Sequence, residues 1–359
     1  MTLTLTLPPK SICILRLSAI GDVCHTIPVV RTLQHHWPET KITWVIGKME
    51  ASLVSDIKGI EFVVFDKSQG WHAYRHLRKH VSGRRFDLLL QMQPAMRASI
   101  AGLFVSAPIR LGFDKIRARD HQWLFTTHRI ASAKQQHVID GFFSFLEYLG
   151  LSQRDLRWDI PIPDDAHRFA EEHLPGSQRT LLISPCSRHT LRNWLPEHYA
   201  RVADHAIAKH DFRVALCGGP SALERDYGNT IRRHMHSTPL DLIGKSNLKG
   251  LLALLARADI LLSPDSGPTH MAAAANTPVL GLYAATNTGR SGPYLGSEWC
   301  VEKYEQAALK YLKKPAADIR WGTKIEYPGV MELIEPQEVI DKLDTFMSRR
   351  QGSPGGATL

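Results

Sequence analysis

Short runs of apolar residues alternate along the chain with longer segments of helical periodicity. In the first half, the apolar runs cover residues 12–17, 42–46, 61–65 and 87–91. Helical patterns lie between and after them, for example at 23–36 and 72–82. Strands that alternate with helices in this way are typical of βαβ units around a parallel sheet. We therefore expect an α/β fold with a doubly wound parallel sheet.

The same alternation begins again in the second half of the chain. Segment 180–187 predicts a strand and its loop, 197–210 an amphipathic helix, and 212–220 a strand that ends in glycines. A helix at 246–259 and the strand, loop, helix and strand of 260–283 follow. The second half is therefore predicted to be doubly wound as well.

These patterns predict two Rossmann-like domains that face a central cleft, where ligands bind at the carboxyl ends of the strands. The first domain is placed at residues 1–160 and the second at 161–334, with a polar, proline-containing linker at 158–169. A last helix over 335–348 is expected to pack back toward the first domain. The tail at 349–359 is expected to be disordered.

Composition narrows the class of protein and its environment. With 359 residues, 43% of them hydrophobic, the chain is long enough for two globular domains. It has no apolar run of about 18 residues that could span a bilayer, and no secretory signal pattern. Its five cysteines form no CxxC pair, which favours reduced thiols over a disulfide framework. We therefore expect a cytoplasmic protein.

The chain is basic, with a formal net charge of +9. Residues 1–165 carry 21 Lys and Arg against 15 Asp and Glu, a surplus of 6, so the first half is the more basic one. Such a surface suits an anionic partner: nucleic acid, anionic lipid headgroups or a phosphorylated substrate. Solubility alone is the alternative explanation.

The segment richest in candidate chemistry is "SPDSGPTHMAAAA", which follows an apolar strand and opens a helix. The small residues Ser266, Gly267 and Thr269 let the backbone approach a ligand, and the helix N-terminus favours a phosphate. His270 could add a hydrogen-bond donor, and Asp265 could accept from sugar hydroxyls. The alternative is that Asp265 or Ser266 caps the helix, which is compatible with anion binding.

Two other segments that follow strands could contribute to the same site. "LCGGP" supplies Gly218 and Gly219 for a close approach, and Glu224 could hold a ribose hydroxyl, although two glycines also suit a simple turn. In "SPCSRHTLRNW", Arg192 could clamp a pyrophosphate with its planar guanidinium, unless this loop is only solvated. Further polar groups in that loop are Ser184, Ser187 and Arg188.

In the first half, "RLSAIGDVCH" places a carboxylate, Asp22, where many α/β proteins hold a phosphate. A carboxylate there would repel a phosphate, so we expect this loop not to bind a nucleotide. A helix N-terminus stabilises the ionised carboxylate that a general base requires, so Asp22 could take a proton from a hydroxyl. An ordinary helix N-cap is the alternative.

Several common site patterns are absent from the sequence. There is no D-x-D pair and no helical HxxxH pair with a third ligand, so we expect neither a structural nor a catalytic metal. The patterns GxxxxGK[ST] and GxGxxG are absent as well, which argues against a P-loop nucleotidase and against an NAD enzyme.

Together these motifs resemble the bacterial lipopolysaccharide heptosyltransferases of glycosyltransferase family 9. The resemblance rests on "LRLSAIGDVCHTIP", "AKQQHVID", "SPCSRHTLRNWLPEHY", "LCGGP…ER" and "SPDSGPTHMAAAANTPVLGLYAATN", which follow one another in family order over most of the chain. The motifs S-x-G-D and [DS]-[ST]-G-x-x-H are quite specific as a pair. The "KQQH" run is most similar to heptosyltransferase I, which acts on Kdo.

The resemblance implies a GT-B fold, with the acceptor in the first domain and ADP-heptose in the second. It implies an inverting, metal-independent transfer of heptose from ADP-L-glycero-β-D-manno-heptose to the Kdo-lipid A inner core, without a cofactor. The enzyme would be peripheral at the cytoplasmic face of the inner membrane. Nucleic acid is not an expected partner, and the oligomeric state is left open.

The resemblance also assigns residues, with Asp22 as the catalytic base. The donor-binding set is Ser184, Ser187, Arg188, Arg192, Gly218, Gly219, Glu224, Lys245, Ser246, Asp265, Ser266, Gly267, Thr269 and His270. The acceptor-binding set is Ser18, Gly21, Lys134, Gln136 and His137.

Within the donor set, the resemblance gives individual roles. Arg192 takes the position of a family lysine that holds the phosphates, and Glu224 matches the ribose-binding acid. Lys245 and Ser246 fall where adenine binds. This chain departs from the family at Leu195, which separates a tryptophan and a proline that usually adjoin.

Other functions stay open at this point. One is a later-step heptosyltransferase, or another GT-B enzyme with a different acceptor. Another is a sugar-nucleotide epimerase, which would act without a lipid acceptor. A third is a scaffold that binds polyanions through its charge, which predicts steeply salt-dependent binding and no turnover.

Overall fold

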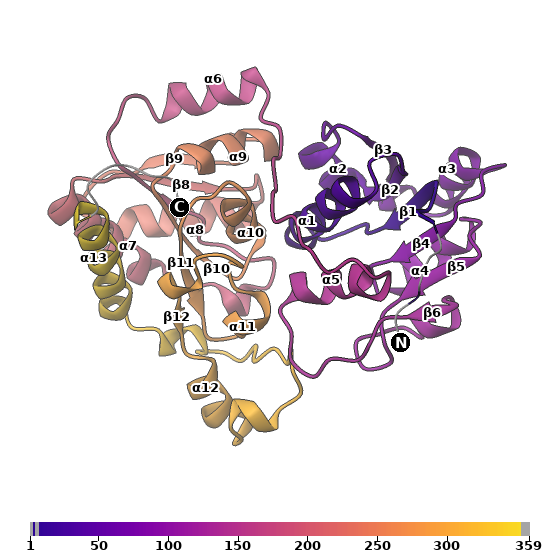
Figure 1. Cartoon of the computed structure of the whole chain (residues 1–359). Helices are drawn as coiled ribbons and strands as arrows, with labels where there is room; N and C mark the ends of the chain where they lie inside the picture. Colours follow the sequence, from indigo (N-terminus) through magenta and orange to yellow (C-terminus); the bar gives the residue numbers. More distant parts are fainter. Residues whose placement is uncertain (1–2, 4–6, 353–359) are drawn as a thin grey trace. The chain divides into compact units, whose positions relative to one another are not determined.

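The computed structural model describes Leu3 and residues 7–352 (Figure 1). The chain divides into two compact units, Met1–Pro161 and Ile162–Leu359. Each unit contains its own six-stranded sheet flanked by helices, so the predicted α/β class is confirmed. The boundary that we expected, between residues 160 and 161, lies one residue from this division.

The first unit is built on a parallel sheet with the strand order β3-β2-β1-β4-β5-β6. The strand order reverses between β1 and β4. In doubly wound sheets, ligands bind at the carboxyl ends of the strands on either side of such a reversal. The strands are β1 (Ser11–Leu15), β2 (Lys41–Gly47), β3 (Ile60–Phe65), β4 (Leu88–Gln91), β5 (Ile109–Gly112) and β6 (His128–Arg129).

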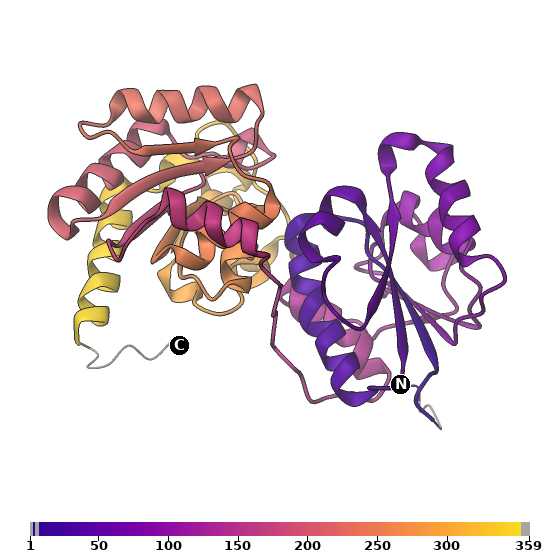
Figure 2. The same cartoon turned by 90° about the horizontal axis from the view of Figure 1, so that it is seen from above.

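Helices lie on both faces of this sheet (Figure 2). On one face, α3 and α4 close a core with buried side chains from β1, β2, β3 and β4. On the other face, α1 and α5 pack against each other. The helices of this unit are α1 (Ile20–His36), α2 (Lys48–Val54), α3 (Trp71–Val81), α4 (Met96–Leu103) and α5 (Val138–Tyr148).

The second unit repeats this architecture with the strand order β12-β11-β10-β7-β8-β9, again with parallel neighbours. Here the strand order reverses between β7 and β10, which places the corresponding ligand position at their carboxyl ends. The strands are β7 (Thr180–Ile183), β8 (Arg213–Gly218), β9 (Leu240–Ile243), β10 (Ile260–Pro264), β11 (Val279–Tyr283) and β12 (Val301–Glu302).

Two groups of helices sandwich the second sheet. One group contains α7, α8 and α13, and the other contains α6, α9 and α10. The helices of this unit are α6 (Asp164–His173), α7 (Pro196–His210), α8 (Ala222–His234), α9 (Leu248–Arg257), α10 (Gly267–Ala274), α11 (Thr288–Ser291), α12 (Tyr304–Ala307) and α13 (Pro336–Gly352). Over the described range of the chain, no helix combines the length and the apolar character needed to cross a bilayer.

Part of the segment that we interpreted as a linker, 158–169, is helical. Helix α6 begins at Asp164, directly after Pro163, and its first turn carries two acids that complement the helix dipole. Ala166 and Ala170 are buried on the face that packs against α9. The proline and the acids therefore mark a helix start rather than a continuous linker.

The last helix packs within its own unit and is longer than predicted. Helix α13 packs against α7 and the β11–β12 edge of its own unit, and its expected packing toward the first domain stays a prediction. Its apolar side chains Leu343 and Phe346 are buried in the core of the second unit. The helix continues through residues 349–352, which we had expected to be disordered. The rest of the expected tail, 353–359, lies outside the described residues.

The buried face of α13 gives the first testable prediction. We expect Leu343→Ala to destabilise the protein by about 2–5 kcal/mol, because it leaves a cavity between α13 and the core. Thr345→Ala, on the exposed side of the same helix, should change the free energy of unfolding by about 0.5 kcal/mol or less. Urea unfolding measures both. Equal effects would show that Leu343 does not pack in this core.

Candidate active site

Four loops lie side by side along one edge of the second sheet, and we call this the donor edge. They span residues 184–195, 219–221, 244–247 and 265–266, and they follow β7, β8, β9 and β10. Because the strand order is β10-β7-β8-β9, these loops are neighbours in space. The Ser184 N–H donates to the Leu262 carbonyl at 3.0 Å across the β7–β10 reversal.

The donor edge brings the whole predicted donor-binding set together. Each of its residues lies in one of the four loops, at the end of the strand before it, or in the first turn of the helix after it. The residues come from four separate segments of sequence, and the order of the strands makes them adjacent. Their roles stay predictions, but their clustering is a feature of the fold.

Asp265 is the centre of the hydrogen-bond network at this edge. Its Oδ2 accepts from Arg192 Nη1 at 3.4 Å and from Ser291 Oγ at 3.3 Å. Its Oδ1 lies 3.6 Å from His270 Nε2, and its backbone oxygen accepts from Ser187 Oγ at 3.2 Å. Burial alone would raise the pKa of Asp265, but His270 and Arg192 outweigh it and the pKa is lowered. An ionised Asp265 therefore joins the loops that follow β7 and β10.

Arg192 is a buried cation that two carboxylates already neutralise. Its side chain is 9% exposed, and its Nε donates to Glu326 Oε1 at 2.8 Å in addition to the bond with Asp265. Burial and the nearby charge of Arg192 lower the pKa of Lys324. A pyrophosphate at this guanidinium would have to share it with Asp265 and Glu326. Neither Glu326 nor Lys324 is apparent from the sequence, because both lie in an irregular segment without a motif.

The start of α10 is not closed by a side-chain cap. Ser266 occupies the N-cap position, but its side chain makes no capping bond to the helix. Instead, Ser266 Oγ and Ser263 Oγ are hydrogen-bonded at 3.0 Å, and Thr269 Oγ1 donates to the Pro264 carbonyl at 2.8 Å. The alternative in which the Asp265 or Ser266 side chain caps this helix is therefore wrong. The first-turn N–H groups keep the orientation that suits an anion.

Glu224 turns back toward the glycines that precede its helix. Its Oε1 accepts from the Gly219 N–H at 2.8 Å, and its Oε2 accepts from Ser221 Oγ at 2.6 Å. A Cβ on Gly219 would lie 2.9 Å from Oε2, and one on Gly218 would lie 3.2 Å from Oε1. The glycines therefore make room for the protein's own carboxylate, in addition to forming a turn.

The loop after β9 is joined to the loop after β8. The Gly244 N–H donates to the Gly218 carbonyl at 2.9 Å, and Gly244 adopts a left-handed φ of +74°. Lys245 and Ser246 follow directly, with Lys245 exposed. Arg188 is exposed in the loop after β7. The Lys245 and Arg188 side chains thus lie at the outer, solvent-exposed side of the donor edge, and Ser246 is half-buried beside Lys245.

In the first unit, Asp22 forms an ion pair with Arg16 where the carboxyl end of β1 meets α1. Asp22 is the third residue of α1, and the N-cap is Ala19, so the interpretation of Asp22 as an ordinary N-cap is wrong. The Ala19 N–H donates to Asp22 Oδ2 at 3.4 Å, as in a capping box. The Asp22 side chain is 33% exposed and that of Arg16 only 7%, so the acid can meet a ligand while the cation cannot.

Arg16 is held firmly in this position. Its Nη1 donates to the Met92 carbonyl at 2.5 Å, and its guanidinium lies 5.0 Å from the centre of the Phe142 ring. Burial lowers the pKa of Arg16, and the charge and hydrogen bond of Asp22 oppose this change. Arg16 therefore fixes the carboxylate of Asp22 relative to the strand ends of β1 and β4.

Gln93 orders the loop that leads to Asp22. Its Oε1 accepts from the Leu17 N–H at 2.7 Å, and its Nε2 donates to Ser18 Oγ at 3.3 Å. Neither Arg16 nor Gln93 was predicted from the sequence. One sequence feature could have indicated them: each is a polar residue that closely follows a buried strand, β1 for Arg16 and β4 for Gln93. The strand order reverses between these two strands.

Part of the predicted acceptor-binding set gathers around the start of α1. Ser18 and Gly21 belong to the loop and first turn that carry Asp22. His137 is the N-cap of α5, and its ring packs edge-on against His25, one turn beyond Asp22, with ring centres 5.5 Å apart.

The remaining acceptor residues lie in the loop before α5. Gln136 Oε1 accepts from Arg117 Nη1 at 2.6 Å, and Arg117 Nη2 donates to the Ala131 carbonyl at 2.5 Å. Arg117 thus orders the segment that carries Lys134, whose side chain is exposed. This role of Arg117 was not predicted from the sequence.

Comparisons with known proteins agree on one family. The family model "Glycosyltransferase family 9 (heptosyltransferase)" matches residues 74–318. The lipopolysaccharide core heptosyltransferase OpsX of Haemophilus influenzae is 42% identical over 335 residues, which cover 93% of this chain and 96% of the relative.

Solved structures show the same fold. A family 9 glycosyl transferase from Veillonella parvula has a TM-score of 0.79 at 23% identity, covering 96% of this chain and 99% of its own. The Escherichia coli heptosyltransferase WaaC, solved with ADP, has a TM-score of 0.72 at 19% identity, covering 94% and 99%. These likenesses confirm the predicted GT-B fold class.

The buried charges of the donor edge give the second prediction. We expect Arg192→Met to lower the free energy of unfolding by about 3 kcal/mol, because Asp265 and Glu326 lose their shared cation. Arg192→Lys keeps the positive charge and should cost less. Urea unfolding at neutral pH compares the variants. Wild-type stability in Arg192→Met would contradict the assignment of a buried ion pair.

Proposed function

The chain belongs to glycosyltransferase family 9, and on this premise we propose that it transfers heptose from ADP-L-glycero-β-D-manno-heptose to Kdo-lipid A. The nearly full-length relative from H. influenzae is named a lipopolysaccharide core heptosyltransferase, which supports this class of reaction. That name does not state which heptose is added. The "KQQH" run, similar to the family members that act on Kdo, supports the first step.

The observation that carries the proposal is the geometry of Asp22, a partly exposed carboxylate that the buried Arg16 orients. Asp22 accepts the proton of a Kdo hydroxyl, and the hydroxyl oxygen forms a bond to C1 of the heptose. The bond from C1 to the β-phosphate oxygen breaks, and ADP leaves with the bonding electron pair. Attack from the face opposite ADP inverts the anomeric configuration.

The donor edge supplies the complementary electrostatics. N–H groups at the start of α10 and the guanidinium of Arg192 stabilise the charge that develops on the departing pyrophosphate, so that no metal is required. Glu224 holds ribose hydroxyls and Asp265 holds hydroxyls of the sugar. Because Arg192 already contacts Asp265 and Glu326, the pyrophosphate draws it partly away from these carboxylates.

The basic first unit suits the acceptor and its membrane. Residues 71–86 carry five Arg and Lys and no Asp or Glu, and the Trp71 side chain at the start of α3 is exposed. Such a surface attracts the phosphates and carboxylates of Kdo-lipid A and an anionic bilayer surface. The enzyme would therefore act as a peripheral protein at the cytoplasmic face of the inner membrane.

The role of Asp22 gives the third prediction. We expect Asp22→Asn and Asp22→Ala to lower the rate of transfer by at least about 100-fold, because the acceptor hydroxyl loses its base. Binding of ADP-heptose should be unchanged. Transfer from ADP-heptose to Kdo-lipid A is measured in EDTA, and donor binding by calorimetry. Glu39→Gln, an exposed carboxylate of the same unit, is the control and should keep full activity.

Each outcome of this experiment decides one part of the proposal. Full activity of Asp22→Ala rejects this residue as the base, and activity that needs an added divalent cation rejects the metal-free mechanism. A wild type that binds the donor but does not modify Kdo-lipid A keeps the family and rejects the acceptor. Transfer to a heptosylated core then identifies a later step, and conversion of ADP-heptose alone identifies an epimerase.

Glu224 gives the fourth prediction. Glu224→Gln should raise the KM for ADP-heptose by about tenfold or more, with a smaller change in kcat, because a charged hydrogen bond to the ribose is lost. Steady-state kinetics with varied donor measure this. Asp226→Asn is the control, because Asp226 is an exposed carboxylate two residues further along α8. An unchanged KM in Glu224→Gln would restrict Glu224 to capping its helix.

A further inference from the structure

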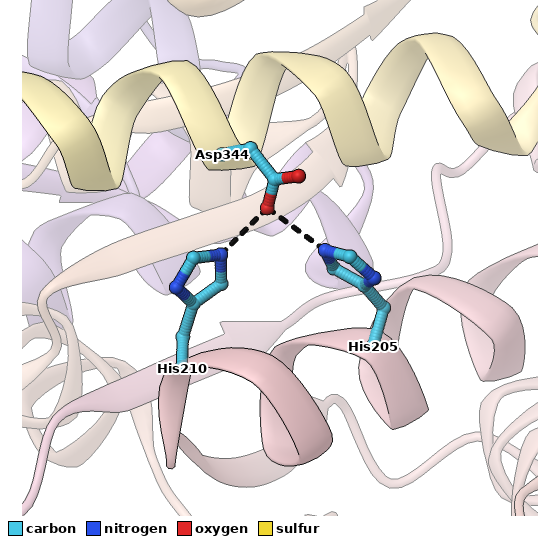
Figure 3. A group of neighbouring side chains, drawn as sticks. All are labelled: His205, His210 and Asp344. Carbon is cyan, nitrogen blue, oxygen red and sulfur yellow. Dashed lines mark hydrogen bonds and ion pairs between the residues drawn. The ribbon is translucent and has the colours of Figure 1, made fainter.

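A second cluster of chemically active side chains lies in the second unit, outside the donor edge. His205 and His210 of α7 converge on Asp344 of α13 (Figure 3). The Nε2 atoms of His205 and His210 lie 2.8 Å and 2.6 Å from the same oxygen, Asp344 Oδ1. The potential ligand atoms of these three residues, one from each, all lie within 4.8 Å of one another. They are therefore close enough to share one ion.

The cluster is remote from the donor edge. Helix α7 begins after the carboxyl end of β7 and ends at His210, just before β8 starts. Its fifteen residues rise about 22 Å, so its last turns lie toward the opposite edge of the sheet. Neither the proposed base nor any residue of the donor-binding set belongs to the cluster. Its function is therefore separate from the transfer reaction.

Against the expectation from the sequence that no metal is bound, we propose that His205, His210 and Asp344 form a zinc site that joins α13 to α7. Two imidazoles and one carboxylate are a ligand set that Zn²⁺ binds in tetrahedral geometry, with water in the fourth position. As the rings lie here, the Nε2–H of each donates to Asp344 Oδ1. To bind the ion, each ring would carry its proton on Nδ1 instead and present the Nε2 lone pair. With bonds near 2 Å, tetrahedral ligand atoms are roughly 3.3 Å apart, so a shift of less than about 1 Å admits the ion.

Exposure supports a site that an ion can enter. The side chains of His205, His210 and Asp344 are 23%, 10% and 25% exposed. They are thus packed well enough to hold their directions, yet they are open to water on one side. A structural bond at this point would link residues that are 134 and 139 positions apart in the chain, so it would constrain a long loop.

Lys209 shapes the carboxylate from its other side. Its Nζ donates to Asp344 Oδ2 at 2.8 Å, which leaves Oδ1 directed at the two histidines. Asp344 is thereby prepared to bind an ion through one oxygen. The positive charge of Lys209 opposes the ion, but its side chain is 56% exposed and can turn into solvent. Removing this charge should therefore preserve or strengthen zinc binding.

Zinc binding to the full-length, untagged protein after EDTA treatment and removal of EDTA tests the proposal. We expect one Zn²⁺ per chain by calorimetry, a higher unfolding temperature with Zn²⁺, and the visible absorption of tetrahedral Co²⁺ when Co²⁺ replaces it. His205→Gln, His210→Gln and Asp344→Asn should each weaken Zn²⁺ binding at least about tenfold and remove the thermal shift. His234→Gln, an exposed histidine of α8, is the matched control and should bind like the wild type.

Lys209→Met separates a metal site from a purely hydrogen-bonded cluster. It keeps the three ligands, so Zn²⁺ affinity equal to or above that of the wild type supports the proposal. No stoichiometric binding by the wild type would overturn it, as would equal affinity in His205→Gln and His234→Gln. Circular dichroism and transfer activity in EDTA show that each variant is folded. Since the transfer assay contains EDTA, failure of the zinc site and failure of the proposed reaction are distinguishable.

Discussion

The ion pair between Arg192 and Asp265 is the interaction on which the second unit's site depends. It connects the loops that follow β7 and β10, the two strands at which the order of the sheet reverses. Either charge alone in this buried position would be costly, whereas Asp265 and Glu326 together pair with Arg192 beside the start of α10. The site can therefore offer charge to a ligand without a large rearrangement of the backbone.

The first unit also has an arginine–aspartate ion pair where its strand order reverses. Arg16 comes from the loop after β1, and it pairs with Asp22 where β1 and β4 flank the reversal. The difference lies in exposure: Asp22 is one-third exposed, while Asp265 is buried. One pair thus presents a carboxylate that suits proton transfer, and the other presents a buried charge network that suits a charged leaving group.

Much of the fold follows from local patterns, and the errors have a common cause. Strand and helix periodicity located the elements, since burial on a sheet or helix face leaves a mark every two or every 3.6 residues. The sequence predicted a helix over 335–348, but its pattern could not say which surface buries Leu343 and Phe346. For α6, proline and acids suggested a linker, and its two small buried alanines gave only a weak helical signal.

The sequence by itself determined the two doubly wound halves, the family, and the candidate residues that belong to motifs, such as Asp22 and Asp265. These are encoded locally, because each motif lies within one strand, loop and helix start. Only the tertiary structure decided the partners of these residues: Arg16 for Asp22, Glu326 for Arg192, and Asp344 for His205. These partners lie in separate segments of the chain, with no fixed sequence spacing between them. They come within bonding distance through the order of the parallel strands and the packing of the helices, not through local sequence.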